Sequence, residues 1–280
     1  MIGFVLAAGY GTRLAALTSE VPKPLLPVGD STPFARAVAK LRAAGATRVL
    51  ANASHLAEQV VAAGRAVSVE VVVEPDAPRG TAGGLAGGRA IFGVEPVLVW
   101  NGDVVADLDA QTLDPGEHFA VLAVRGLGPP GTGNVGLDEN RRVVRLRQRS
   151  FGQEARGAFY AAVMGLSAAA VAAAPTVGCL VGDLLIPWLG DGARVHAVEV
   201  AGAWHDIGDL ESYLAANVAE RFVAADVSVP GNVEVVRSAI GSGVRVTGAG
   251  RIDEVVAWPG ANLAAPLSRA VVTRTRTVRL

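Results

Sequence analysis

The first hundred residues alternate short apolar runs with helical patterns, and this alternation constrains the fold more than any other feature. The apolar runs are continuous, as in Val71-Val72-Val73, whereas a strand with one solvent-facing side alternates apolar and polar residues. The pattern therefore predicts an α/β fold with a doubly wound, mostly parallel sheet and a site at the carboxyl ends of its strands. The predicted strands are 2–8, 48–53, 67–73 and 96–100, and the predicted helices are 33–44, 57–63 and 81–91.

A mixed pattern follows from residue 120 to about residue 200. We interpret it as an insertion that extends the sheet and forms a second wall of the site. A last helix, 210–222, follows Asp209, which is a suitable N-cap. The insertion is predicted to contain strands 120–124, 143–147 and 158–166, and helices 167–174 and 181–189.

The pattern changes again after residue 225. Ile240, Val246, Ile252 and Trp258 recur at a spacing of six, with small and polar residues between them. A six-residue repeat is typical of a parallel β-helix, in which each coil buries its aliphatic residues against the next. We therefore expect a catalytic domain at 1–225 and a short left-handed parallel β-helix at 226–280, and an irregular β-rich tail is the alternative for the second part.

Composition limits the classes of partner. The formal net charge is −1, so no global field attracts the chain to nucleic acid or to an anionic membrane. No apolar stretch reaches about 18 residues, and the first residues resemble a strand more than a signal peptide, so we expect a cytoplasmic protein. Cys179 is the only cysteine, which excludes an internal disulfide, and it is expected to be a small core residue.

A glycine loop, 7–13, directly follows the first strand. Glycines at such a position let backbone N–H groups approach a phosphate. A dinucleotide-binding loop would need a third glycine where Leu14 stands, and a P-loop would need Gly-Lys-Ser/Thr, which is absent. The loop is therefore a phosphate-binding candidate of a different kind.

The residues that follow the loop make the motif specific to one family of proteins. Leu6-Ala7-Ala8-Gly9-Tyr10-Gly11-Thr12-Arg13-Leu14 is followed by Pro22-Lys23-Pro24-Leu25-Leu26-Pro27-Val28. With these two motifs the chain resembles the sugar-phosphate nucleotidylyltransferases, which have a nucleotide-diphospho-sugar transferase, Rossmann-like fold. The resemblance implies that Arg13 binds the outer phosphates of a nucleoside triphosphate and that Lys23 supports the reacting phosphate. Lys23 is one of only two lysines in the chain, which favours a role that arginine does not fill.

Three later segments continue the resemblance in the same order. Residues 80–84, Gly-Thr-Ala-Gly-Gly, are similar to the segment that receives the base. Asp103 in Asn-Gly-Asp resembles the first magnesium ligand of that family, and Asp206 in Trp-His-Asp-Ile-Gly resembles the second. The implied catalytic residues are Arg13, Lys23 and Asp103, the metal ligands are Asp103 and Asp206, and the nucleotide-binding residues are Leu6, Ala8, Gly9, Gly11, Thr12, Arg13, Gly80, Thr81 and Gly83.

The resemblance is looser on the sugar side. Arg149 stands where the family has the lysine of Glu-Lys-Pro, and Ala162 stands where it has a glycine in the sugar-facing strand. Together with Gly136 they are the implied sugar-phosphate-binding residues. The usual Gly-Thr after the second aspartate is Gly208-Asp209 here. These departures leave the sugar open.

The implied reaction joins a nucleoside triphosphate to a sugar 1-phosphate and releases pyrophosphate. Mg²⁺ held by two carboxylates would bridge the phosphates, and no general base is needed because a phosphate monoester is already ionised. GTP with mannose 1-phosphate, or a related hexose or heptose phosphate, is the preferred pair, and thymidylyl or uridylyl transfer is the alternative within the family. Two hypotheses from other functional classes are a noncatalytic NDP-sugar sensor, which would be a regulatory relative in this family, and a hexapeptide acyltransferase. The acyltransferase is disfavoured because the coils are few and residues 226–280 lack a histidine. Homo-oligomers could form through the β-helix.

Overall fold

The computed structural model describes residues 1–280, apart from the side chain of Ala15. The chain divides into two compact units, which are described separately. The first contains Met1–Tyr10 and Ala37–Trp204, and the second contains Gly11–Arg36 and His205–Leu280. Among the described helices, none is both long enough and apolar enough to cross a membrane.

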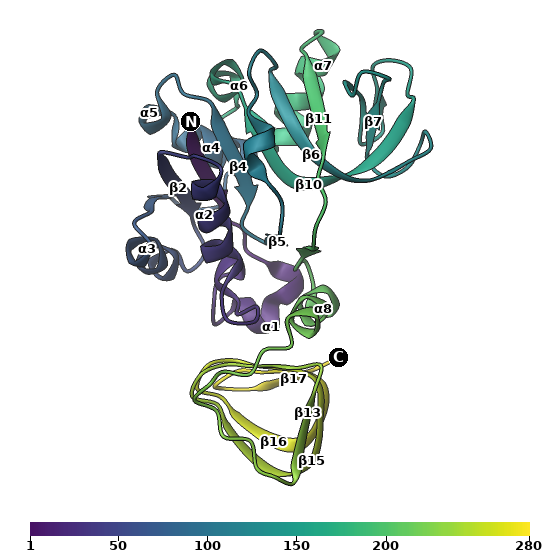
Figure 1. The fold of residues 1–280 in the computed structure, drawn as a ribbon. Coiled ribbons are helices and arrows are strands. Elements are labelled where there is room, and N and C mark those ends of the chain that lie inside the picture. Colours follow the sequence, from purple (N-terminus) through teal and green to yellow (C-terminus); the bar gives the residue numbers. More distant parts are fainter. The chain divides into compact units, whose positions relative to one another are not determined.

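The first unit is an α/β unit built on one large sheet (Figure 1). Its helices are α2 (Pro33–Ala43, whose first turn belongs to the second unit), α3 (Ala57–Ala66), α4 (Gly80–Gly87), α5 (Arg89–Phe92), η3 (Ala110–Leu113), α6 (Ala168–Ala173), η4 (Leu180–Leu185) and α7 (Ile186–Gly190). Its strands are β1 (Ile2–Leu6), β2 (Arg48–Ala53), β3 (Glu70–Val73), β4 (Val97–Asn101), β5 (Val104–Ala106), β6 (Ala120–Gly128), β7 (Val135–Leu137), β8 (Val143–Leu146), β9 (Arg149–Ser150), β10 (Arg156–Leu166) and β11 (Val195–Glu199).

The strands of the large sheet follow the order β3-β2-β1-β4-β10-β7-β8-β9, and β6 pairs with both β10 and β11. The strands from the first hundred residues are parallel to one another, as the sequence predicted. β10 is antiparallel to β4, β6 and β7, so the inserted segment extends the sheet in a mixed arrangement. The predicted site therefore lies at the edge of the sheet where the parallel strands have their carboxyl ends.

Helices cover both faces of the parallel part. The Phe4 ring meets the Phe92 ring of α5 edge to face, with 5.3 Å between their centroids. On the other face, a Cβ atom at Gly3 would lie 3.1 Å from Leu41 of α2, so this helix approaches β1 closely. Successive strand residues point to opposite faces, so β1 is buried on both sides. This arrangement confirms the doubly wound part of the prediction.

Some predicted elements need correction. The expected helix 81–91 is two helices, α4 and α5, which meet at Gly88. The Phe92 ring folds back over this glycine and occupies the space of a Cβ atom there. The expected helix 181–189 begins as the π-helical turn η4 and continues as α7. The sequence analysis also missed β11, which pairs in parallel with β6, and the short strands β5 and β7.

The second unit combines the glycine-loop segment with the C-terminal part of the chain. Asp209 caps α8: its Oδ1 accepts a hydrogen bond of 2.9 Å from the Ser212 N–H, and Ser212 Oγ accepts one of 3.0 Å from the Asp209 N–H. This capping box confirms the predicted N-cap. The elements are η1 (Thr12–Leu14), α1 (Ala15–Thr18), η2 (Lys23–Leu25), β12 (Trp204–Asp206, which begins in the first unit), α8 (Leu210–Glu220), β13 (Val233–Val236), β14 (Ala239–Ile240), β15 (Arg245–Ala257), β16 (Asn262–Val272) and β17 (Thr277–Arg279).

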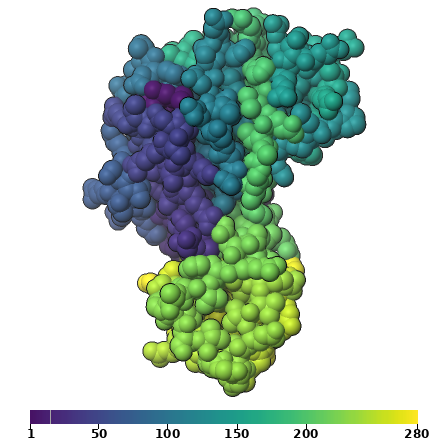
Figure 2. All heavy atoms as spheres, viewed as in Figure 1, coloured from purple at the N-terminus to yellow at the C-terminus, as the bar shows by residue number. Residues whose placement is uncertain are grey.

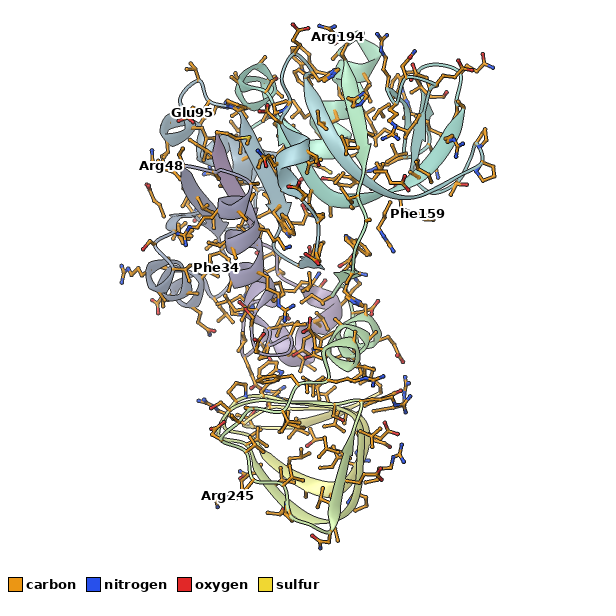
Figure 3. All side chains as sticks on the ribbon, viewed as in Figure 1. Phe34, Arg48, Glu95, Phe159, Arg194 and Arg245 are labelled. Carbon is orange, nitrogen blue, oxygen red and sulfur yellow. The ribbon has the colours of Figure 1, made fainter. Side chains whose placement is uncertain are left out.

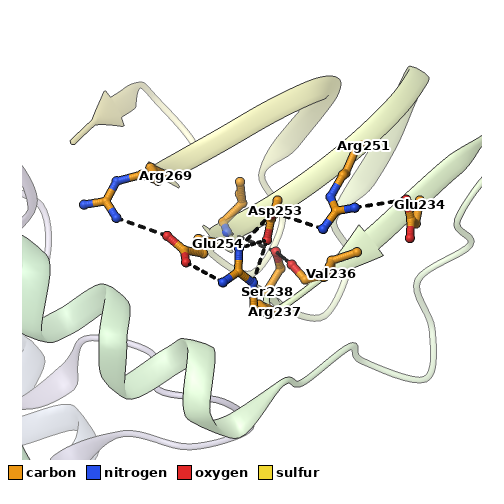
Figure 4. Close-up of polar contacts among 9 residues, drawn as sticks. Glu234, Val236, Arg237, Ser238, Arg251, Asp253, Glu254 and Arg269 are labelled. Carbon is orange, nitrogen blue, oxygen red and sulfur yellow. Dashed lines mark hydrogen bonds and ion pairs between the residues drawn. The ribbon is translucent and has the colours of Figure 1, made fainter.

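Strands β13 to β16 stack in parallel, with similar residues above one another, whereas β17 pairs antiparallel with β16. Val246 pairs with Leu263 and Ile252 with Leu267, which are 17 and 15 residues apart along the chain. Ile252 and Leu263 are fully buried in the shared apolar core. Figure 2 shows this part, green to yellow, as a closely packed body. Ion pairs cross neighbouring strands on its outside, including Arg237 with Asp253 at 2.9 Å (Figure 4).

Candidate functional site

The carboxyl ends of the parallel strands carry the predicted loops of the first unit. β1 ends at Leu6, and β4 ends two residues before Asp103. The Gly102 N–H donates a hydrogen bond of 2.9 Å to Leu6 O, so the two loops leave the sheet side by side. Asp103 is half-buried there. The predicted residues at this edge are Leu6, Ala8, Gly9 and Asp103.

A buried polar network joins the glycine loop to the predicted base-binding segment. Asn52 Oδ1, at the end of β2, accepts a hydrogen bond of 2.7 Å from the Ala7 N–H. Asn52 Nδ2 donates to Glu74 Oε1 at 2.6 Å, and Glu74 Oε2 accepts from the Arg79 N–H at 2.7 Å. Asn52 and Glu74 are 2% and 6% exposed, so these hydrogen bonds are shielded from water. The network fixes the spacing of two loops that the sequence assigns to one nucleotide.

Gly84 of α4 closes this network from one side. A Cβ atom at this position would overlap Asn52 Nδ2 and lie 2.9 Å from Glu74 Oε1. The glycine is therefore required by the close approach of the helix to the polar pair, a requirement that is packing-based and needs no ligand.

The predicted base-binding segment, 80–84, packs against residues 176–180. Thr81 Oγ1 accepts a hydrogen bond of 2.8 Å from the Leu180 N–H, and the Ala82 N–H donates to Gly178 O at 2.9 Å. A Cβ atom at Gly83 would lie 2.6 Å from Thr176 O. Gly80 is exposed at the start of α4, Thr81 is half-buried, and Gly83 is buried. Of the three predicted residues, Gly80 and Thr81 are thus the ones a ligand can reach.

Cys179 is not the core residue that the sequence suggested. Its side chain is half-buried, and its Sγ accepts a hydrogen bond of 3.1 Å from Arg147 Nη2. Burial raises the pKa of the thiol, but hydrogen bonds from the Gly182 and Val181 N–H groups, Thr81 and Arg147 outweigh it, and the pKa lies below its ordinary value. The reason is its position directly before η4, where backbone donors are unpaired.

This environment predicts the reactivity of the thiol. We expect iodoacetamide to label Cys179 with a pH midpoint below the value of about 8.5 that is usual for cysteine. Because a cation stabilises the thiolate, Arg147→Ala should move the midpoint upward and slow labelling at pH 7. The rate as a function of pH, followed by mass spectrometry, tests this, with Arg156→Ala as the matched control. Equal midpoints in the two variants would show that Arg147 does not act on the thiol.

Gly136, one of the predicted sugar-phosphate-binding residues, is buried in β7 beneath an ion pair. Arg145 Nε and Nη2 donate to the two carboxylate oxygens of Glu154 at 2.8 and 2.9 Å. These bonds hold the pKa of the Glu154 carboxyl below its ordinary value, against the effect of burial. A Cβ atom at Gly136 would lie 2.6 Å from Glu154 Cδ. The absence of a side chain at Gly136 therefore leaves room for the ion pair.

Ala162 and Arg149, the other predicted sugar-phosphate residues, lie on different strands. Arg149 is exposed in β9. Ala162 lies in β10 with φ of 62°, which is the left-handed region, and its side chain is half-buried. Here β10 advances from Tyr160 to Met164 while β6 advances only two residues, so the strand bulges. Alanine in this conformation costs about 1 kcal/mol relative to glycine, which the resemblance expects at this position.

An arginine that the sequence analysis did not single out lies beside this bulge. Arg125 belongs to β6, and its Cζ is 4.7 Å from the centroid of the Trp204 ring. Trp204 Nε1 donates a hydrogen bond of 2.9 Å to Ala161 O. The ring is thereby fixed to β10 directly before Ala162.

In the second unit, Gly11 begins the turn that leads into η1. Its φ is 62°, and a Cβ atom there would lie 2.8 Å from Thr18 Cγ2, so only glycine fits. Thr18 Oγ1 donates to Gly11 O at 3.1 Å. Thr12 and Arg13 are exposed in η1, whereas Lys23 in η2 is only 9% exposed.

The two predicted cations of this unit lie near the start of α8. A Cβ atom at Gly208 would be 2.9 Å from Arg13 Nη2. Hydrogen bonds from Ser212 lower the pKa of the Asp209 carboxyl most, and the charges of Arg13 and Lys23 lower it further. Asp206 is exposed at the end of β12.

Helix α8 holds the segment that carries Lys23. Tyr213 Oη donates a hydrogen bond of 2.6 Å to Pro27 O and accepts one of 3.0 Å from Trp258 Nε1. Asn217 Oδ1 accepts from the Gly29 N–H at 3.1 Å. Burial raises the pKa of Tyr213, so it stays protonated and can donate. The segment that carries Lys23 is thus fixed by Tyr213 and Asn217, whose partners Pro27 and Gly29 lie 186 and 188 residues earlier in the chain.

Lys23→Arg is expected to lower turnover at least about tenfold although the charge is kept. The side chain is almost buried, and a planar guanidinium is larger than an ammonium and directs its donors differently. Initial rates of pyrophosphate release at saturating substrates test this. Lys40→Arg, on α2, is the control and should behave as the unaltered protein. Unchanged kinetics in Lys23→Arg would contradict the argument for a compact ammonium.

The predicted residues fall in both units. The sequence analysis missed Asn52, Arg125 and Tyr213. The one available signal was the amide of Asn52 within strand 48–53, which is apolar apart from this residue and Arg48 at its start. The expectation that Asp103 and Asp206 hold one metal ion stays a prediction. The first unit contains Leu6, Ala8, Gly9, Gly80, Thr81, Gly83, Asp103, Gly136, Arg149 and Ala162, and the second contains Gly11, Thr12, Arg13, Lys23 and Asp206.

Known proteins match the chain in sequence and in fold. Residues 3–114 match the model of the MobA-like NTP transferase domain. An N-acetylmuramate alpha-1-phosphate uridylyltransferase from Neisseria meningitidis is 38% identical over 39% of this chain and 49% of its own length. A mannose-1-phosphate guanylyltransferase from Mycobacterium tuberculosis is 32% identical over 52% of this chain and 43% of its own. The chain therefore spans less than half of the length of these relatives.

Solved structures agree with the fold. HddC from Yersinia pseudotuberculosis, complexed with GMP-PN, aligns with a TM-score of 0.63 over 78% of this chain and 98% of its own at 21% identity. A putative glucose-1-phosphate thymidylyltransferase from Bacillus anthracis aligns with a TM-score of 0.63 over 80% of this chain and 96% of its own, also at 21% identity. At this identity the likeness shows the fold alone. The sequence matches confirm the resemblance on which the site was predicted.

Proposed function

We propose, on the premise that residues 3–114 form a MobA-like NTP transferase domain, that the chain transfers a nucleotidyl group from a nucleoside triphosphate to a sugar 1-phosphate. The products are an NDP-sugar and pyrophosphate. One observation carries the proposal: the buried pair Asn52 and Glu74 ties the glycine loop to the base-binding segment, at the sheet edge where Asp103 lies.

In this reaction the chain binds and aligns charged groups. Backbone N–H groups of the glycine loop and the Arg13 guanidinium hold the triphosphate, and Lys23 neutralises charge at the α-phosphate. An oxygen of the sugar phosphate attacks the α-phosphorus, and pyrophosphate leaves with the electrons of the bond that breaks. The attacking phosphate is already ionised, so no residue needs to remove a proton from it.

Asp103 and Asp206 are the residues proposed to hold Mg²⁺. A half-buried carboxylate beside a phosphate-binding loop suits this ion, which takes one or two protein carboxylates together with substrate phosphates. When bound, it supplies neutralisation of the phosphate charges.

The base and the sugar are finer proposals. GTP with mannose 1-phosphate remains the preferred pair, supported by a guanylyltransferase among the relatives. A uridylyltransferase is also among them, so UTP is the first alternative. A cytoplasmic location and homo-oligomers formed through the C-terminal part are further proposals.

For residues 226–280 we propose a short left-handed parallel β-helix, with 1–225 as the catalytic domain. Supporting this, parallel partners in β15 and β16 are 17 or 15 residues apart, which is close to three six-residue repeats per coil. The buried residues of successive coils lie above one another.

Pyrophosphate release tests the proposed function directly. Each nucleoside triphosphate is combined with each of a panel of sugar 1-phosphates, with Mg²⁺ and with Asp103→Asn as the blank. We expect one pair to give strong release. No release from any pair, together with intact NDP-sugar binding, would replace the enzyme by a noncatalytic sensor.

A further inference from the structure

Arg125 occupies a particular place at the site edge. In the sheet it pairs with Phe159, an exposed residue of β10 (Figure 3). β4 and β6 flank β10 on its two sides and both run antiparallel to it, so they end at the same edge. Adjacent strands are about 4.8 Å apart, which puts Arg125 roughly 10 Å across the sheet from β4. Trp100 of β4 pairs with Val163 and Arg125 pairs with Phe159, so Arg125 also lies further along toward this edge. Two strand spacings and this offset separate Arg125 from the Asp103 loop.

The Trp204 ring holds the guanidinium of Arg125 in place. Arg125 Cζ lies over the Trp204 ring, 4.7 Å from its centroid, and the ring is fixed by its 2.9 Å hydrogen bond to Ala161 O. A cation held over an aromatic face in this way can still donate its N–H groups to other partners. The donors are therefore preorganised before any ligand binds.

Arg125 has no anionic partner in the part of the chain that the structure describes. No hydrogen bond or ion pair joins its guanidinium to a described residue. Arg145, in the same inserted segment, shows the contrast, because both oxygens of Glu154 accept from it. A half-buried guanidinium with free parallel donors matches the geometry of a carboxylate.

We propose that Arg125 binds a carboxylate carried by the sugar of the sugar 1-phosphate, at the end of the sugar remote from its phosphate. The inference rests on the proposed function, because Asp103 is the group that directs the phosphate. One pyranose ring with its substituents can bridge the distance from the Asp103 loop to Arg125. Among the hexose 1-phosphates of the proposed function, the inference therefore favours one that bears a carboxylate, such as a hexuronic acid 1-phosphate, over the neutral mannose 1-phosphate.

Isothermal titration calorimetry on the full chain, without nucleoside triphosphate, tests this independently of turnover. The probes are glucuronic acid 1-phosphate against glucose 1-phosphate, and mannuronic acid 1-phosphate against mannose 1-phosphate. In at least one series we expect the acid to bind about tenfold more tightly, which is typical of one charge-assisted hydrogen-bonded pair. Arg125→Gln should remove this difference and leave the Kd of the neutral sugar unchanged, and Arg125→Lys should keep part of it.

Arg156→Gln is the control, because Arg156 is an exposed arginine of the neighbouring strand β10 and its loss should leave the difference intact. Equal affinity for acid and neutral sugar in both series, or no binding of any of the four probes, would overturn the proposal. Equal weakening of all four probes by Arg125→Gln would assign Arg125 to the 1-phosphate and would overturn it too. If calorimetry shows the tenfold difference but no pair releases pyrophosphate, the proposed function fails and the carboxylate site stands.

Discussion

Asp103→Asn is expected to lower the rate of pyrophosphate release by about a thousandfold or more. The amide keeps the shape of the side chain but removes the negative charge, and metal-assisted charge neutralisation contributes several kcal/mol to such reactions. The fold should be unaffected. The loop is held by the hydrogen bond from the Gly102 N–H to Leu6 O and by that from Trp100 Nε1 to Val104 O, and neither involves the Asp103 side chain.

Two comparisons make this result specific. Asp191→Asn alters an exposed aspartate of the same unit and should leave the rate unchanged. Thermal unfolding followed by circular dichroism should give the same midpoint for both variants and the unaltered chain. A rate within tenfold of the unaltered chain in Asp103→Asn would remove this residue from the metal site.

Asn52→Leu should destabilise the first unit by about 3 kcal/mol, because it leaves the Ala7 N–H without an acceptor and the Glu74 carboxylate without its amide donor, both away from water. The same change should raise KM for the nucleoside triphosphate more than KM for the sugar 1-phosphate. The network positions the glycine loop and the predicted base-binding segment, whereas the predicted sugar-phosphate-binding residues lie on β7, β9 and β10 and take no part in it. Urea unfolding and initial rates measure the two effects.

A second substitution separates the effect of the buried Glu74 charge from the other losses caused by Asn52→Leu. Adding Glu74→Gln to Asn52→Leu removes the buried charge and should recover part of the stability, since an uncompensated carboxylate is the most costly group left behind. Asn140→Leu, at an exposed position, is the control and should change the free energy of unfolding by less than about 0.5 kcal/mol. If the double variant is less stable than Asn52→Leu alone, the carboxylate is not what destabilises the single variant.

The sequence was sufficient for the features that depend on local pattern. The continuous apolar runs predicted the parallel strands because burial on both faces leaves no polar positions, and Asp209 predicted the start of α8 because its capping interactions lie within four residues. The position of Asn101-Gly102-Asp103 at a strand end could be predicted because the motif directly follows such an apolar run.

The remaining features depend on contacts between distant residues. Asn52 and Glu74 are 22 residues apart, Tyr213 and Pro27 are 186 apart, and no local pattern pairs them. Cys179 was misjudged because its surroundings come from Arg147 and from the helical turn that follows it, whereas the sequence shows only one cysteine among apolar residues. Arg125 gave no signal because its meaning depends on Trp204, 79 residues later along the chain.

The left-handed backbone at Ala162 limits how this chain can change its preference for substrates. Glycine would remove the steric strain that alanine meets at φ of 62°, and a β-branched residue would add to it. Larger residues such as Leu56 and Arg147 adopt similar φ values elsewhere in the chain, so enlarging the proposed sugar wall at this position costs backbone strain but is not excluded. Under the proposed function, new specificities arise at lower cost at its neighbours, because Phe159 and Arg125 pair in register and accept side chains of many sizes without this strain. Libraries for altered sugar use are best placed at those two positions, with residue 162 left unvaried.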